Sequence, residues 1–311
     1  MAKRRKPVAD FAIYLLVRIV VCLVQTLSWR WAMSLAEGLA WLAYCLDRRH
    51  RQVALENLRH AFPHLDALAL DALVRGVYRH FAAVVVETIL MPRVLYRSNL
   101  YSFIHYANPA DLERVMGWTR GGRPLMVLTG HFGNWEMLGY ATGLFGCRGG
   151  VVARRLDNPH LDRFLADFRR KTGLILLDKN TDYPRILDIL AGAGFLGMVG
   201  DQDAGSRGLF VDFFGRPTST FKSIALLSLE YQAPILVLGA ARLGAPMQYR
   251  LYLEDVILPE DYAERTDATR AITQRYTDAL ERMVRRHPEQ YFWVHRRWKH
   301  QPRVRKSKKV A

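Results

Sequence analysis

The chain has 311 residues, of which 50% are hydrophobic, so it can bury one large core or two modest ones without disulfide support. Lys and Arg number 45 against 29 Asp and Glu, and the formal charge of +16 points to a polyanionic neighbour such as nucleic acid, anionic lipid or an acidic carrier. The three cysteines, Cys22, Cys45 and Cys147, are scattered and form no CxxC pair, which argues against a disulfide framework and against a zinc site.

The chain starts with a long apolar run, Phe11 to Trp29, whose length matches the ~20 residues that cross a bilayer. A second apolar stretch, Trp31 to Leu46, follows. Basic clusters flank the pair, Lys3 to Lys6 before it and Arg48 to Arg51 after it, so a single span would place one cluster on the wrong side of the membrane. We therefore predict that residues 1–50 attach to the cytoplasmic face as an interfacial helix or a shallow helical hairpin. A buried soluble helix is the alternative.

Residues 51–311 are predicted to form one α/β catalytic domain, because short apolar runs alternate with amphipathic helices. Asn158 and Pro159 begin one predicted helix, which Gly173 ends. A later helix carries an apolar stripe from Ile272 to Val284 and stops before Pro288. The candidate strands are Leu125–Thr129, Gly150–Ala153, Leu174–Leu177, Phe195–Val199, Pro234–Gly239 and Tyr249–Leu253.

A glycine-rich turn with a histidine and a carboxylate follows the first of these strands, and it contains Gly130, His131, Gly133 and Glu136. Open α/β sheets place reactive groups at such strand ends. A Glu136 carboxylate folded back onto His131 would fix the ring tautomer while the other nitrogen takes a proton from an alcohol, which is general-base chemistry. The glycines would leave backbone amides free for an oxyanion. The alternative is a histidine that caps the helix, with Glu136 in its first turn.

The string from Gly130 to Glu136 resembles the motif of the lipid A biosynthesis lauroyl/myristoyl acyltransferases, a branch of the lysophospholipid acyltransferase superfamily. That superfamily's signature is a histidine, four residues and an acidic residue, met here by His131 and Glu136. Further blocks match in the family order, and they are Val151 to Pro159, Gly200 to Asp203, Phe213 to Gly215 with Thr218, and Pro288 to Lys299.

The resemblance implies an α/β/α sandwich fold. It also implies transfer of a fatty acyl chain from a thioester of acyl carrier protein or coenzyme A to a hydroxyl of a glycolipid such as a lipid A precursor. By the same resemblance, no metal or organic cofactor takes part, and His131 and Glu136 are catalytic. From the apolar run and its basic flanks we predict that the catalytic domain lies on the cytoplasmic side of the cell inner membrane, where thioester donors are made.

Charged groups near the histidine are candidate substrate contacts. Arginine forks bind phosphate through two hydrogen bonds, so Arg154 and Arg169 are predicted to hold a phosphorylated sugar or a pantetheine phosphate, unless they belong to a solvated helix face. Asp201 follows another predicted strand and either positions substrate at the mouth of the site or only forms a turn. Gly133 and Asn134 complete the predicted contacts, because the turn lets a substrate approach the backbone.

Other functions fit parts of the sequence. A superfamily member that acylates a lysophospholipid or a mannosylated lipid would share the histidine and glutamate, but the Glu-Gly-Thr block of glycerolipid acyltransferases is absent from the sequence. A nucleic-acid-binding module would explain the charge but lacks a supporting motif. A metal-dependent hydrolase using His131, Glu136 and Asp201 lacks the clustered histidines of common zinc enzymes. The acyl length, the acceptor hydroxyl and the oligomeric state are left open.

Overall fold

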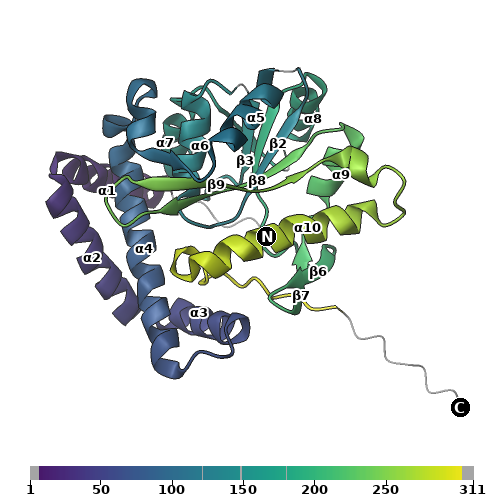
Figure 1. Cartoon of the computed structure of the whole chain (residues 1–311). Helices are drawn as coiled ribbons and strands as arrows, with labels where there is room; N and C mark the ends of the chain where they lie inside the picture. The colour runs from purple at the N-terminus through teal and green to yellow at the C-terminus, as the bar shows by residue number, and fades with distance from the viewer. Residues whose placement is uncertain (1–6, 121, 148, 180, 303–311) are drawn as a thin grey trace, which may run out of the picture.

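The computed structural model describes residues 7–120, 122–147, 149–179 and 181–302, so the basic cluster Lys3 to Lys6 lies outside the described residues. A seven-stranded sheet lies between two layers of helices, which confirms the predicted α/β sandwich (Figure 1). The strand order is β1-β9-β8-β2-β5-β3-β4. These strands are β1 (Ile104–Tyr106), β2 (Leu125–Thr129), β3 (Gly149–Ala153), β4 (Ile175–Asp178), β5 (Phe195–Val199), β8 (Ile235–Arg242) and β9 (Tyr249–Ile257).

All six predicted strands are present, and β2 is the most enclosed of them. Its five residues are all buried, and it pairs in parallel with β5 on one side and β8 on the other. β8 and β9 pair antiparallel and extend further than predicted. The sequence pattern missed β1, which has three residues, and a separate hairpin of β6 (Leu209–Phe213) and β7 (Arg216–Thr220).

Each face of the sheet has its own helix layer, because successive strand residues point to opposite faces. Val127 and Phe195 pack with Val115 of α5 on one face, whereas Met126 and Leu128 pack with helices of the other. Figure 1 shows α10 across the sheet from α5, α6 and α7. The first layer is α5 (Pro109–Arg120), α6 (Trp135–Leu144) and α7 (Pro159–Arg170), and the second is α8 (Tyr183–Ala191), α9 (Ser223–Glu230) and α10 (Ala268–Arg286).

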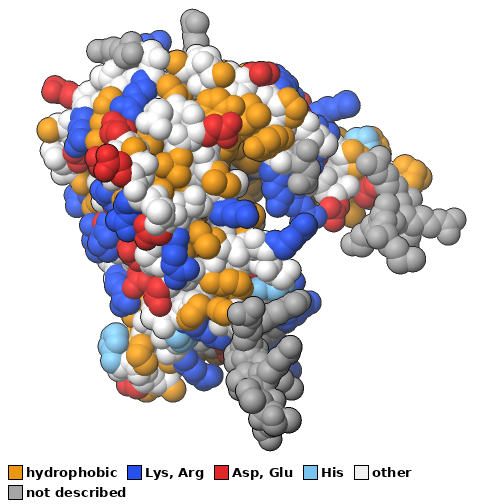
Figure 2. All heavy atoms as spheres, turned by 90° about the vertical axis from the view of Figure 1, so that its right-hand side faces the viewer, with side chains coloured by type: hydrophobic (Ala, Val, Ile, Leu, Met, Phe, Trp, Pro, Cys, Tyr) orange, Lys and Arg blue, Asp and Glu red, His pale blue; other side chains and the backbone are white. Residues whose placement is uncertain are grey.

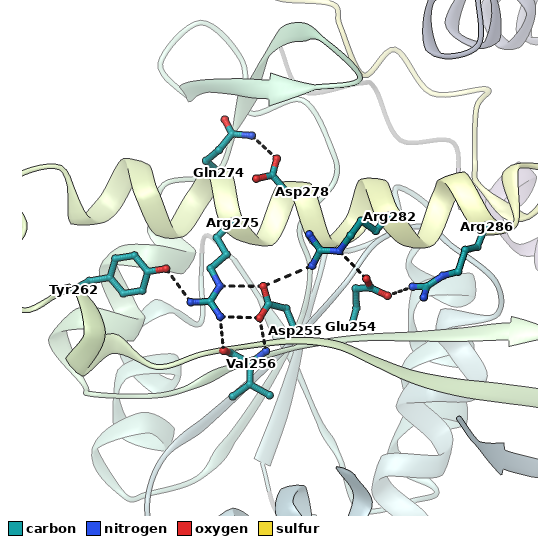
Figure 3. A network of polar contacts seen from close by, with 9 residues as sticks. All are labelled: Glu254, Asp255, Val256, Tyr262, Gln274, Arg275, Asp278, Arg282 and Arg286. Atoms are coloured by element: carbon teal, nitrogen blue, oxygen red, sulfur yellow. Dashed lines mark hydrogen bonds and ion pairs between the residues drawn. The ribbon is translucent and has the colours of Figure 1, made fainter. Parts of the chain in front are cut away.

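Ion pairs connect α10 to strand β9 of the sheet (Figure 3). Arg275 forms a fork with Asp255 of β9, with nitrogen–oxygen distances of 3.0 and 2.8 Å. Glu254 accepts from Arg282 at 2.8 Å and also pairs with Arg286. With the predicted apolar stripe buried beneath it, α10 is held to the sheet along its length.

Four helices precede the sheet: α1 (Pro7–Thr26), α2 (Trp29–Leu46), α3 (Arg48–Ala61) and α4 (Ala67–Val94). By length and composition, α1 could cross a membrane. Its residues are all described and only Val24 is buried, so α1 is not a core helix of this chain, while its attachment to a membrane stays a prediction. Val24 packs on Val86 and Leu90 of α4 together with α2. The predicted division at residue 50 falls inside α3 and stays a prediction.

Three short 3-10 helices complete the described part of the fold. They are η1 (Arg97–Ser102), η2 (Pro259–Tyr262) and η3 (Pro288–Gln290). After η3 the chain runs back to the turn that follows β2, where Tyr291 forms an isolated antiparallel bridge with Phe132. The C-terminal segment therefore borders the predicted site.

Candidate active site

The turn between β2 and α6 holds His131 at the carboxyl end of a central strand. Gly133 has a φ of +56°, and a Cβ there would lie 1.8 Å from the carbonyl oxygen of Ala240, so no other residue fits. Asn134 then caps α6, because its side chain accepts from the backbone amide of Met137 at 2.9 Å. The predicted order of strand, turn and helix is confirmed.

A buried carboxylate holds His131 at two points. Oδ1 of Asp201 lies 2.7 Å from Nδ1 of His131, and Oδ2 accepts from the His131 backbone amide at 2.8 Å. Asp201 follows β5, which pairs with β2, so the ends of two neighbouring strands bring the residues together. A carboxylate only accepts hydrogen bonds, so Nδ1 carries the proton and Nε2 keeps its lone pair. That Nε2 lies 3.4 Å from the side-chain nitrogen of Gln202.

Burial and charge act on the His131 pKa in opposite directions. Desolvation lowers this pKa, but the charge and hydrogen bond of Asp201, with a smaller contribution from Glu136, hold it above the ordinary histidine value. For Asp201, burial raises the pKa, but the charge and hydrogen bonds of His131 hold it well below the usual carboxyl range. Asp201 is therefore ionised and stabilises the protonated form of its partner.

The structure places Glu136 and Asp201 differently from the predicted arrangement. Glu136 pairs with Arg169 of α7, whose Nε donates at 3.0 Å and whose Nη2 donates to the other oxygen. The side chains of Arg169 and Glu136 are only 20% and 17% exposed. Asp201, expected to meet substrate at the mouth, is 1% exposed and takes the place on the imidazole that was expected for Glu136. The reason is that β2 and β5 are parallel neighbours, so the residues after their carboxyl ends meet and Asp201 reaches Nδ1 of His131. Glu136, in the first turn of α6, faces α7 instead.

Gly133 and Asn134 are enclosed rather than open to a substrate. The backbone amide of Gly133 donates to the carbonyl of Gln290 at 2.9 Å, and that of Asn134 donates to Ala240 at 3.0 Å. The Asn134 side chain is fully buried and donates to the hydroxyl of Tyr249 at 2.8 Å. Since the His131 amide is taken by Asp201, the expectation that this turn leaves its amides free for an oxyanion does not hold at these three residues.

Two buried residues of α4, His80 and Glu87, form hydrogen bonds that hold the turn in place. Glu87 is fully buried and accepts from the Tyr249 hydroxyl and from Arg242, the latter at 2.8 Å. Tyr249 in turn accepts from Asn134, the helix cap. Nε2 of His80 lies 3.1 Å from the carbonyl oxygen of the turn's second glycine. No local sequence pattern marks these contacts, because Glu87 and Tyr249 are 162 positions apart.

A cavity of about 520 Å³ opens beside His131, within the ~300–1,000 Å³ common for small-molecule sites. Four polar residues of the cavity lining each follow a parallel strand. They therefore lie together at the carboxyl ends of these strands. The four residues are His131 after β2, Arg154 after β3, Lys179 after β4 and Gln202 after β5. The remaining lining is largely apolar and includes Leu138, Val151, Leu165, Phe168, Met198 and Ile224.

The two predicted arginines occupy different places in this cavity. Arg169 lies in the wall and holds Glu136, whereas the side chain of Arg154 is 77% exposed and pairs with Asp157 at 3.2 Å. Figure 2 shows more of the chain's basic surface, with Lys and Arg side chains across the middle of the face that α8, α9 and the β6–β7 hairpin present. Because Arg154 is exposed and Lys179 also lines the cavity, the cavity combines a cationic rim with an apolar interior.

Three rings surround the imidazole of His131. The Trp135 ring lies 4.9 Å from the imidazole, and Phe292, whose backbone amide donates to the His131 carbonyl, lies 6.0 Å away. His295 lies 6.1 Å away, and burial lowers its pKa to about 4, so it is neutral near physiological pH. The sequence places Trp135 in the string from Gly130 to Glu136 and the other two residues in the block from Pro288 to Lys299, but it does not predict their contacts with the imidazole. Within the described part of the chain, no three His, Cys, Asp or Glu side chains are grouped to hold a metal ion.

Comparison with known proteins gives one consistent result. The family described as bacterial lipid A biosynthesis acyltransferase matches residues 2–300. The chain is 26% identical over 258 residues to the lipid A biosynthesis palmitoleoyltransferase of Escherichia coli (strain K12), covering 82% of this chain and 80% of that protein. A lipid A biosynthesis acyltransferase of Shigella flexneri matches equally well. One from Haemophilus influenzae is 24% identical over 274 residues, covering 86% of this chain and 84% of its own length.

Proposed function

The chain belongs to the bacterial lipid A biosynthesis acyltransferase family, and on this premise we propose that it moves a fatty acyl chain from an acyl thioester to a hydroxyl of a lipid A precursor, with His131 as general base. Membership confirms the predicted family and makes the chain an acyltransferase of lipid A synthesis. The donor, the acceptor hydroxyl and the roles of the site residues belong to the proposal.

One observation carries the catalytic assignment. Asp201 binds Nδ1 of His131, so the lone pair of Nε2 is on the side of Gln202, a residue of the cavity wall. An imidazole in this state accepts a proton at Nε2, and the ionised carboxylate stabilises the imidazolium that forms. We assign Asp201 as the residue that positions His131, in addition to the predicted pair of His131 and Glu136.

The proposed reaction needs one proton to move twice. Nε2 of His131 takes the proton from the acceptor hydroxyl as its oxygen attacks the thioester carbonyl carbon, forming the new carbon–oxygen bond. The tetrahedral intermediate then collapses, the carbon–sulfur bond breaks, and the thiolate takes the proton from His131 and leaves as a thiol. No covalent acyl-enzyme is required. Glu136 contributes negative charge near the imidazole and fixes Arg169 at the cavity wall.

The cationic rim suits both substrates. Acyl carrier protein and coenzyme A both carry phosphate on the thioester arm, and a lipid A precursor is a phosphorylated glycolipid. Arg154 and Lys179 follow neighbouring strands at the rim, where exposed cations attract phosphate from solution. The apolar interior formed by α6, α7 and the sheet receives the acyl tail.

The proposed location is the cytoplasmic side of the cell inner membrane, where thioester donors are made. Both α1 and α2 expose large apolar residues, including Leu16 at 62%, Leu23 at 61%, Trp31 at 68% and Trp41 at 68%. Exposed apolar surface of this extent is characteristic of a membrane or protein contact. Because α1 also contacts α7 through Phe11 and His160, attachment would hold the cavity close to the lipid.

Lipid mass spectrometry tests the function directly. Lipid A from cells with the protein, without it, and with His131→Ala in its place should differ by one acyl chain between the first and the other two. Purified protein should then transfer a labelled acyl chain from thioester donor to lipid A precursor. An unchanged lipid A profile, together with acylation of a lysophospholipid in vitro, would instead assign a different acceptor.

A further inference from the structure

The apolar interior continues past the main cavity. A second, smaller cavity of about 80 Å³ lies on the same face of the sheet, next to α5. Four residues form walls of both cavities: Val127, Leu138, Thr142 and Phe195. The two spaces are therefore neighbours with shared walls, and we call them the outer cavity, beside His131, and the inner cavity.

Three residues of β2 show the direction in which the two cavities extend. Thr129 lines the outer cavity, Val127 lines both, and Leu125 lines the inner one. Alternate strand residues point to one face, and four residues span about 13 Å of strand. The path therefore runs from the catalytic end of β2 back along the sheet.

Helix α6 repeats this order on the opposite wall. Glu136 and Gly139 line the outer cavity, Thr142 lines both, and Phe145 lines the inner one. Glu136 and Phe145, the residue that follows the last residue of α6, are nine positions apart, which is about 14 Å along the helix axis. In both elements, residues at one end line the outer cavity and residues at the other end line the inner cavity, with shared residues between these ends.

The inner cavity also has polar lining residues. These are Tyr106, Asn108 and Asp111. The Tyr106 hydroxyl is buried and has no hydrogen-bond partner among the described residues, and burial raises its pKa. Burying hydrocarbon against such a group gives no compensating hydrogen bond, so the inner cavity has a natural end for an alkyl chain.

We propose that the inner cavity receives the terminal carbons of the acyl chain and sets the longest chain that the enzyme transfers. This rests on the proposed function, in which the thioester carbonyl lies at His131 and the tail extends into the outer cavity. A short acyl chain ends within the outer cavity and does not displace the side chains that form walls of both cavities. A longer chain passes Val127, Leu138, Thr142 and Phe195 and stops near Tyr106.

Filling the inner cavity is the direct test, with saturated acyl donors of increasing length and a lipid A precursor as acceptor. Cys147 is partly buried and lines only the inner cavity. We define the cut-off as the chain length at which the transfer rate falls about tenfold, a discrimination that one methylene group can produce in an apolar pocket. Cys147→Phe should move this cut-off to shorter chains. Cys45→Phe, the same change at an exposed cysteine of α2, should leave that length unchanged. Gly139→Phe enters only the outer cavity, where a Cβ meets nothing within 4 Å, and should slow all donors.

An unchanged cut-off length in Cys147→Phe, with wild-type rates for shorter donors, would overturn the proposal. If wild-type protein transferred no acyl chain of any length to a lipid A precursor, the proposed function itself would fail instead. The two failures are therefore distinguishable in one donor series.

Alkylation of Cys147 gives a second test should Cys147→Phe fail to fold. In protein carrying Cys22→Ser and Cys45→Ser, Cys147 is the one remaining thiol. Its iodoacetamide labelling is measured with saturating thioether analogues of the donor, which cannot transfer their chains. Long-chain analogues should slow labelling about tenfold and short-chain analogues should not, because only a long tail reaches the thiol. Equal labelling rates with all analogues would overturn the proposal.

Discussion

Arg169 of α7 and Glu136 of α6 form a two-pronged ion pair in the cavity wall, with at least four-fifths of each side chain buried. Arg169→Ala should lower kcat/KM on the order of ten- to a hundredfold, because a hydrogen bond to a charged group is lost and Glu136 keeps an unpaired charge. Arg169→Lys should recover only part of this loss, since lysine cannot form the fork. Steady-state kinetics with both variants measures the effect.

Arg154 is the matched control for this prediction, since it lines the same cavity but is 77% exposed. Its pairing with Asp157 is a surface contact of the kind that contributes little. Arg154→Ala should therefore raise KM a few fold at most and leave kcat unchanged. An Arg154→Ala variant as impaired as Arg169→Ala would show that the fork to Glu136 is not the decisive feature.

The buried contact between Tyr249 and Glu87 should stabilise the fold behind the catalytic turn. Tyr249→Phe removes one partner of a fully buried carboxylate, which costs about 1–3 kcal/mol of unfolding free energy. Denaturant unfolding in detergent measures this cost. Tyr252→Phe, on the same strand but with only a 3.4 Å contact to His287, should change it much less. Equal unfolding free energies of the two variants would show that the contact between Tyr249 and Glu87 does not stabilise the fold behind the turn.

Activity should fall at low pH because the base works only when neutral. The His131 pKa lies above the ordinary value near 6.5, since Asp201 outweighs the effect of desolvation, so kcat should fall as pH drops through that raised pKa. Asp201→Asn removes the charge that raises the pKa but keeps the burial that lowers it. The acid limb should therefore move to lower pH while the plateau rate falls. An acid limb that stays in place in Asp201→Asn would contradict the pairing.

Membrane attachment should depend on the exposed apolar side of α1. Leu16→Glu combined with Leu23→Glu places two charges where both leucines are more than half exposed, and should move protein from the membrane to the soluble fraction without detergent. Leu68→Glu is the control, because Leu68 is 82% exposed at the start of α4. Wild-type protein in the soluble fraction at low salt would contradict attachment.

Local patterns predicted the elements that carry the site. The apolar run Leu125–Thr129 and the turn after it appear as β2 and the start of α6, and Asn158 caps α7 through the backbone amides of His160 and Leu161. Both signals are local, because strand burial and helix capping depend on residues a few positions apart.

The sequence could not predict which side chains of the site contact one another. The sequence predicts Asp201 at a strand end and at the mouth of the site, but which carboxylate reaches the imidazole depends on the register of β2 with β5. Glu136 is five residues from His131, and that short spacing favoured it, yet its side chain meets Arg169, 33 positions away. The β6–β7 hairpin was missed as well, because its turn uses Phe214 at a φ of +54°, a conformation that no sequence rule assigns to phenylalanine.

The rate of acyl transfer by His131→Ala tests the central claim most directly. It is measured with saturating donor and lipid A precursor, alongside circular dichroism and membrane fractionation to show that the variant folds and attaches. A positioned base contributes ~10²- to 10⁴-fold to the rate, so His131→Ala should lose at least about 99% of turnover. Combining it with Asp201→Asn should cost little more, because Asp201 then positions a base that is gone. A His131→Ala variant that kept more than about a tenth of wild-type turnover would contradict general-base catalysis by this histidine.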